Sequence, residues 1–393
     1  MIYDTNYQLQ TKKAKLVNAY VDGEAALKAI PELYLIKESG MTSQRWIDYY
    51  SYAKPPSWCK TALDRIVGYI SEMQWSAEAT LPPQLEYLTD EASVYGDGLD
   101  SIALRCASAQ ATDGRVGLLV NPTEDNHMVI VEIPMVRIIS VQYASVGGRD
   151  KAVKVVLSNR DPYEFTQVPL IYKVLSLDVE GHYTYSEYDV KSVADIEKAT
   201  PILSLNPTLY GRKLAYIPFV VINTSNLSGA SYSDPYLLPL AYLSSHAYNA
   251  DAAYRRTLRC TSDPTMTIIG GTGKVLGDLS ETAGSVNWLP QDYSMTYTEF
   301  TGAGAAAQRQ ALIDLATDAE QHILAIRADT DLSGRALSVI MTSQMAGFAR
   351  MVDVLCDGIE LVLRYMADWA GTTAGQYRLR VASGLVSDDP AKQ

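Results

Sequence analysis

The sequence predicts an α+β fold in which a strand-rich middle third is followed by a helical last third. Between residues 128 and 190, short runs of β-branched and aromatic residues alternate with turn signals such as Gly147-Gly148 and Asp161-Pro162, a pattern typical of antiparallel sheet. Between residues 234 and 369, apolar residues recur at helical spacing over three long runs. With 393 residues, 47% of them hydrophobic, the chain has enough material for a large core or for two to three domains.

The first third predicts helices. Residues 1–40 form a polar, helical lead-in that is clearest at Glu24–Ile30. After the Pro55-Pro56 break, Ser57 can cap a helix whose apolar residues share one face. We expect a further helix at Leu99–Ala111 and then a strand at Gly117–Val120.

The middle third is predicted to be one antiparallel meander followed by one more strand. Its expected strands are Met128–Ile133, Val136–Tyr143, Ala152–Leu157, Ile171–Leu177 and Tyr183–Tyr188, with Phe219–Asn223 leading into a polar linker at 224–233.

In the last third, Asp234 and Pro235 give a strong helix start, because a capping carboxylate precedes a proline that loses nothing at the first helical position. The expected elements are a helix at Pro235–Arg259, strands at Thr265–Ile269 and Ser285–Leu289, helices at Ala305–Ala328 and Arg335–Trp369, and a strand at Tyr377–Val381.

Charge and composition exclude several classes of protein. The formal net charge of −12 argues against tight nucleic-acid binding, which requires Lys and Arg to neutralise phosphates. The four cysteines are far apart and form no CxxC pair, which disfavours zinc and disulfide frameworks and fits a reducing compartment. No signal peptide and no apolar run long enough to span a membrane is evident.

No motif predicts catalysis, so we expect no enzyme activity, no cofactor and no metal site. The glycine-rich run Gly270, Gly271, Thr272, Gly273 and Lys274 resembles a phosphate loop, but Ile268 stands where the first glycine belongs and Val275 follows the lysine. A glycine-rich hairpin turn explains the run without any ligand.

Two charged groups remain open in interpretation. The basic residues Arg255, Arg256 and Arg259 suit the negative end of a helix and a solvated surface, and the alternative is contact with nucleic acid or a neighbouring subunit. The loop Asp329, Thr330, Asp331, Leu332, Ser333 joins two long helices, and its acids need be no more than a solvated turn.

The order of elements resembles the portal (head–tail connector) proteins of tailed bacteriophages. Three segments carry this likeness: SDPYLLPLAYLSSHAYNADAAYRRTLR at 233–259, similar to a portal stem helix; IYKVLSLDVEGHYTYSEYDV at 171–190, similar to a wing sheet; and residues 299–369, similar to a second stem helix, a tunnel loop and the long helix behind it. The likeness covers most of the chain, and it rests on the order of elements and not on any one diagnostic motif.

The resemblance implies a domain map. It assigns 1–232 to a β-rich wing, 233–259 and 304–328 to stem helices, 260–303 to a strand-rich clip, 329–334 to the tunnel loop, 335–370 to a long wing helix, and 371–393 to a short remnant of a crown. The short crown departs from many portals.

The resemblance also implies a function without catalysis. It predicts a ring of about twelve copies at one capsid vertex of a virion, assembled in the bacterial cytoplasm, through which double-stranded DNA is packaged and ejected. Its implied partners are the major capsid protein, a terminase, a head–tail adaptor and DNA that slides without sequence preference, with no membrane.

The acidic insert suits such a channel, because five acids stand against one lysine between residues 260 and 300, a net charge of −4. A mostly repulsive wall lets DNA slide, since every ion contact would add to a salt-dependent grip.

On this interpretation the candidate sites fall into three groups. The tunnel loop at the DNA is Asp329, Thr330, Asp331, Leu332 and Ser333, and the candidate phosphate contacts are Lys274, Arg255, Arg256 and Arg259. The clip docking rim is Gly270, Gly271, Thr272, Gly273 and Lys274. Two rival classes stay open: another ring-forming adaptor or scaffold protein, and a nucleic-acid-processing enzyme without a recognisable motif.

Overall fold

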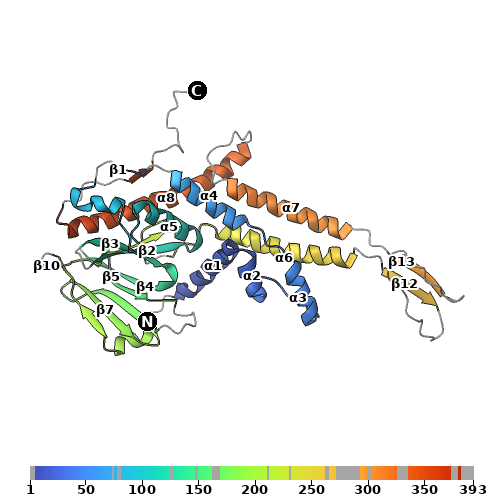
Figure 1. Cartoon of the computed structure of the whole chain (residues 1–393), viewed down its shortest axis with the longest axis horizontal. Coiled ribbons are helices and arrows are strands. Elements are labelled where there is room, and N and C mark those ends of the chain that lie inside the picture. The colour runs from blue at the N-terminus through green and yellow to red at the C-terminus, as the bar shows by residue number, and fades with distance from the viewer. Residues whose placement is uncertain are drawn as a thin grey trace, which may run out of the picture. The chain divides into compact units, whose positions relative to one another are not determined.

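The protein mixes helices and sheets, which confirms the predicted α+β class (Figure 1). This computed structural model describes residues 5–72, 75–77, 81–123, 127–146, 149–161, 169–209, 212–229, 232–261, 265–270, 293–298, 303–324, 335–372 and 379–381. Two compact units are distinguished: Met1–Ala26, Pro56–Ser244 and Ala319–Gln393 form the first, and Leu27–Pro55 with Ser245–Asp318 form the second.

The described helices are α1 (Thr5–Asp22), α2 (Glu24–Ala29), α3 (Ser43–Tyr52), α4 (Trp58–Glu72), α5 (Leu99–Thr112), α6 (Leu238–Thr261), α7 (Ala303–Leu324) and α8 (Arg335–Trp369). The described strands are β1 (Trp75–Ala77), β2 (Arg115–Pro122), β3 (Met128–Pro134), β4 (Ile138–Val146), β5 (Arg149–Ser158), β6 (Ile171–Leu177), β7 (Tyr183–Asp189), β8 (Leu203–Leu205), β9 (Thr208–Leu209), β10 (Arg212–Lys213), β11 (Phe219–Asn223), β12 (Thr265–Gly270), β13 (Tyr293–Thr298) and β14 (Leu379–Val381).

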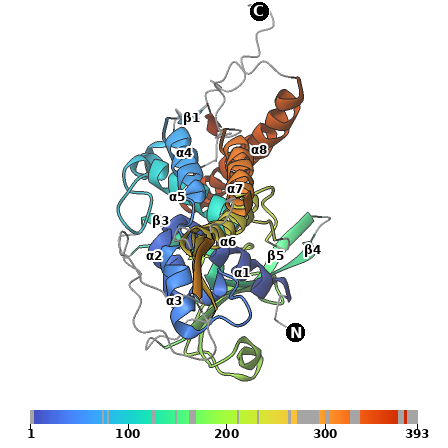
Figure 2. The same cartoon turned by 90° about the vertical axis from the view of Figure 1, so that its right-hand side faces the viewer.

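A five-stranded antiparallel sheet, ordered β4-β5-β6-β7-β8, is the largest described sheet of the first unit, and Figure 2 shows its strands β4 and β5 side by side. Successive residues of β5 face opposite sides, so each face builds its own core. Val155 and Leu157 join Leu175 in one apolar cluster, whereas Val156 joins Tyr172 in another. Both faces of this sheet are therefore covered.

A second sheet, ordered β11-β2-β3, packs against helices of the first unit. α8 packs against β11 and β2, and α5 packs against both strands and α8. The backbones approach closely at Gly358 of α8, where a Cβ atom would lie 2.6 Å from the Ile222 side chain of β11. A side chain larger than hydrogen does not fit there without movement.

The predicted single meander is wrong at its first strand. The Met128–Pro134 strand pairs with β2, and the meander begins only at Ile138. Pro134 precedes a short 3-10 helix, Met135–Arg137, which interrupts the chain between the two strands. β3 and β4, on either side of this break, therefore belong to different sheets.

The long helices were predicted closely. The helix expected at Arg335–Trp369 has those bounds, and α7 begins two residues before its predicted start at Ala305. α6 begins at Leu238, three residues after its predicted start at Pro235. Just before α6, the amides of Tyr236 and Leu237 donate to the carbonyls of Gln110 and Ala111 at the end of α5.

Some elements differ from expectation. The sequence did not predict α3 or β13, which pairs in antiparallel register with β12 from Thr265↔Thr298 to Gly270↔Tyr293. The expected strand at Ser285–Leu289 lies outside the described residues. Within the described part of the chain, no helix is both long and apolar enough to cross a bilayer.

Candidate functional site

A hollow of the second unit lies between α3 and the C-terminal half of α6. The backbone on either side of α3 is fixed to α6 by polar side chains. The Asn249 amide donates to the carbonyl of Tyr34 at 2.9 Å, and its oxygen accepts from the amide of Ile36 at 2.9 Å. The Asp251 carboxylate accepts from the amide of Lys54 at 2.7 Å. These bonds hold α3 beside α6 from both of its ends.

α3 itself is defined by a cap and an aromatic face. The Thr42 hydroxyl accepts from the amide of Arg45 at 3.3 Å, which satisfies one of the amides left free at a helix start. Trp46 and Tyr49 are buried, and their rings stack with centroids 5.8 Å apart. With its aromatic face buried, the helix directs Arg45 and Tyr52 outward.

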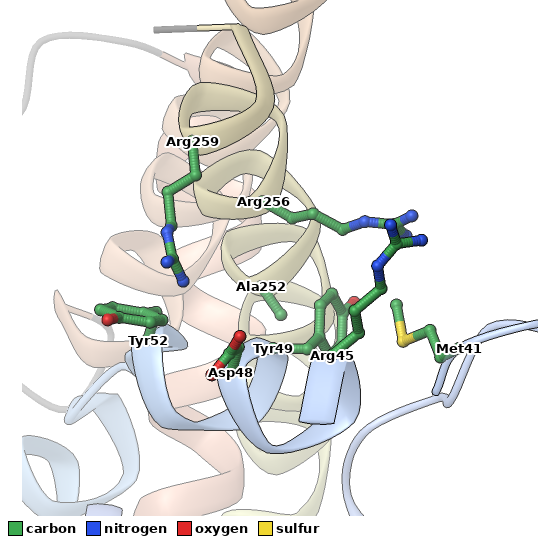
Figure 3. A pocket seen from close by; sticks show the side chains of 8 residues that line it. All are labelled: Met41, Arg45, Asp48, Tyr49, Tyr52, Ala252, Arg256 and Arg259. Carbon is green, nitrogen blue, oxygen red and sulfur yellow. The ribbon is translucent and has the colours of Figure 1, made fainter. Parts of the chain in front are cut away.

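The hollow, called here the arginine pocket, has a volume of about 350 Å³. In Figure 3 the side chains of Arg45 and Arg256 extend toward each other, and Arg259 reaches toward Tyr52. Cationic groups form much of the rim, and aromatic and aliphatic groups form much of the wall. The lining residues are Met41, Arg45, Asp48, Tyr49, Tyr52, Ala252, Arg256 and Arg259.

The arginines of α6 have different partners. Arg255 does not line the pocket, and it donates to Asp251 one turn earlier at 2.7 Å. Arg256 pairs with Glu38. The Arg259 guanidinium lies over the Tyr52 ring, 4.0 Å from its centroid, a cation–π contact. Thus only two of the three arginines of this cluster face the hollow.

Positive charges outnumber negative charges among the residues that line the pocket. Arg45 and Arg259 have no carboxylate within ion-pair distance among the residues that the structure describes. Burial raises the pKa of the Tyr49 phenol, the Glu38 carboxylate adds to the rise, and Arg256 opposes it. Tyr49 therefore stays neutral and serves as a wall that can donate a hydrogen bond.

The other predicted site residues are placed less completely. Gly270 ends β12, while Gly271, Thr272, Gly273 and Lys274 lie outside the described residues. The loop residues Asp329, Thr330, Asp331, Leu332 and Ser333 lie outside them too. The roles proposed for these positions stay predictions.

Sequence reasoning missed the half of the pocket that α3 supplies. Met41, Arg45 and Tyr52 were not singled out, although Thr42 followed by an aromatic pattern at Trp46, Tyr49 and Tyr50 is a helix signal. That signal locates a helix, but it does not say that the helix would lie against residues two hundred positions later.

A second polar cluster, Asp178, Glu180 and His182, sits in the β6–β7 hairpin of the first unit. The Asp178 carboxylate accepts from the amides of His182 at 2.8 Å and Glu180 at 2.9 Å, and the bond from His182 is the main reason its pKa is lowered. Glu180 also lies 3.7 Å from Lys213. These hydrogen bonds define the turn of the β6–β7 hairpin.

Taken together, the fold and site define a mixed α+β protein with long helices joined through a β-hairpin and a basic pocket beside one of them. A family model described as a domain of unknown function (DUF4055) matches residues 236–370, a segment that contains α6, α7 and α8. No curated protein matches the chain.

Three solved structures of gene transfer agent (GTA) particles are similar at low level. A chain from the neck of an empty GTA particle, computed with C6 symmetry, is 12% identical with a TM-score of 0.42 and covers 84% of this chain and 82% of its own. A chain from the neck of the native particle, computed with C12 symmetry, has 12% identity, a TM-score of 0.40 and coverage of 84% and 81%. A chain of the native virion has 11% identity, a TM-score of 0.41 and coverage of 90% and 88%. These likenesses are too distant to assign a function.

Proposed function

We propose that this chain is the subunit of a portal-type ring at one vertex of a phage capsid, through which double-stranded DNA passes. The proposal rests on one observation, which is that apolar residues of α7 are not buried. None of its residues between Ala303 and Asp318 is buried, although Leu312, Ile313 and Leu315 are apolar and Ile313 is 48% exposed. A helix of this kind needs a partner, because most helical stability comes from burying an apolar face.

Identical copies supply that partner most simply. In a ring, each copy presents one side to the next by a head-to-tail contact, and such contacts close when the rotation closes. The sequence of helix α6, hairpin β12–β13, helix α7 and helix α8 is also the order that the portal resemblance requires. On this proposal the hairpin region docks a terminase or an adaptor, the ring sits against the major capsid protein, and the chain has no catalytic activity of its own.

Electron microscopy and mass photometry of the purified protein test the ring. We expect closed rings with a central opening wide enough for a duplex. A compact monomer at micromolar concentration would refute the proposal, and rings too narrow for DNA would favour the rival adaptor or scaffold function.

Two substitutions on α7 test the carrying observation. Leu312→Glu with Leu315→Glu places two charges on the apolar stripe, so we expect rings to be lost while far-ultraviolet circular dichroism keeps its helical signal. The matched control is Thr317→Glu, which adds a charge on the exposed opposite face. Rings that persist in the double variant would show that α7 is not the contact between copies.

A further inference from the structure

We propose that the arginine pocket is a docking site for an acidic protein segment that brings a carboxylate next to an apolar side chain. The site is distinct from the α7 surface and does not depend on the ring. It would give the chain a specific protein partner beyond the DNA of the proposed function.

Charge is the first argument. Three guanidinium groups, from Arg45, Arg256 and Arg259, line the pocket, whereas Asp48 is its one lining carboxylate. The side chains of Arg45 and Arg256 extend toward each other from two different helices (Figure 3). Like charges brought together repel, and an anion placed between them relieves that repulsion and can accept several of their N–H donors. The chain, which is acidic as a whole, here concentrates positive charge.

The second argument concerns the kind of anion. Arg256 already binds a carboxylate, that of Glu38, and the Glu38 side chain is 47% exposed. The pocket therefore accepts the geometry of a carboxylate, and an incoming acid can share or replace Glu38. Planar guanidinium groups bind carboxylates through paired hydrogen bonds, so a second acid fits the same rim.

The third argument is the apolar wall. Met41, Tyr49, Tyr52 and Ala252 line the same hollow as the arginines. A nucleic-acid backbone binds along an open basic surface and gains little from such a wall, whereas a peptide can insert an aliphatic or aromatic side chain there. A volume of about 350 Å³ has room for a side chain of this kind together with its neighbouring carboxylate.

The pocket is also held ready for binding. Gly40, at a φ of 83°, turns the chain between Glu38 and Met41, and the amide of Met41 donates to the carbonyl of Glu38 at 3.3 Å. Asn249 and Asp251 fix the backbone on both sides of α3. Preorganisation of this kind lowers the entropy lost on binding, so a short segment can bind measurably.

Selection from a display library of random seven-residue peptides, with the full chain as bait, tests the proposal. We expect enrichment of peptides that place Asp or Glu beside Leu, Phe or Met. Binding of the enriched peptides should weaken at least tenfold in the double variant Arg45→Gln, Arg259→Gln. Arg309→Gln, which removes one positive charge from an exposed position on α7, should leave binding unchanged.

Three results would overturn the proposal. The first is the absence of any acidic enrichment, and the second is peptide binding that is equal in the double variant and the wild type. The third comes from a labelled 20-base-pair duplex measured at low salt: if the double variant weakens duplex binding but not peptide binding, the pocket is a phosphate site. Electron microscopy of the same double variant separates this test from the ring, because rings should persist when only the pocket is changed.

Discussion

Gly358 offers a sharp test of how α8 packs on the sheet of the first unit. A Cβ atom at this position would lie 2.6 Å from both Cγ1 and Cδ1 of Ile222 and 3.2 Å from a methyl group of Leu227. The residue is buried, so the neighbours must move to admit a methyl group. Overpacking of this kind costs about 1–3 kcal/mol. Replacement of a helical glycine by alanine gains about 1 kcal/mol in helix propensity.

For Gly358→Ala we therefore expect a net change between neutral and a destabilisation of about 2 kcal/mol, the difference between these two effects. Gly347 is the matched control on the same helix, because it is exposed and a Cβ there would meet only Tyr236 at 3.6 Å, an ordinary contact. Gly347→Ala should gain the propensity alone and stabilise the protein by up to about 1 kcal/mol.

Thermal unfolding at one fixed protein concentration measures the difference between the two variants, and urea unfolding gives its free energy. A concentration held constant is needed because association would shift the midpoint. If the Gly358→Ala variant is as stable as the Gly347→Ala variant, the close approach of α8 and β11 is refuted.

A double-mutant cycle strengthens the test. Ile222→Ala removes both Cγ1 and Cδ1, the two atoms that oppose a new methyl at position 358, at a cost of about 2–5 kcal/mol by itself. We expect Gly358→Ala to be better tolerated in that background, with a coupling of about 1 kcal/mol, which is typical of residues in contact. Additive effects would show that the two positions do not touch.

Two further predictions concern titratable groups of the first unit. Hydrogen bonds from Arg105 lower the pKa of Asp97 to about 2, so its stabilising contribution is present above about pH 4 and is lost as the pH falls toward 2. Asp97→Asn should therefore lower the unfolding temperature at pH 7 and lose this effect in acid, whereas the exposed Glu86→Gln should show no such trend. A variant with Cys260→Ser should react with a thiol reagent at pH 8 only after unfolding, because burial raises the pKa of its three remaining thiols, Cys59, Cys106 and Cys356. Fast labelling of the native chain, or an Asp97→Asn effect that persists at pH 2, would contradict the packing described.

The sequence predicts best where a periodic pattern is long. α8 was predicted to the residue because its apolar positions repeat over many turns and Gly371 follows its end. The strands at Ile171–Leu177 and Phe219–Asn223 were predicted with equal accuracy because turn residues bound them. Apolar periodicity and turn residues determine secondary structure locally, and both can be identified in the sequence.

Which strands pair with each other is harder to predict than where the strands lie, because pairing depends on contacts between residues distant in sequence. β3 carries the same alternation as the strands of the meander, and nothing in that alternation states that it pairs with β2. β2 in turn pairs on its other edge with β11, a strand about one hundred residues later. A side-chain period identifies a strand's buried face, but it does not name its neighbour.

The arginine pocket shows the same limit at the level of a site. The sequence shows the α6 arginines as a basic helix end, and that pattern alone leaves both helix complementation and contact with a partner open. The structure separates them by their contacts: Arg255 pairs within its own helix, whereas Arg256 and Arg259 face a hollow completed by α3. Arg45 lies about two hundred residues away, so the concentration of charge that motivates a partner appears only when both helices are seen together. A cluster of charges in sequence is thus weak evidence for a site, and convergence of charges from separate elements on one hollow is the stronger evidence.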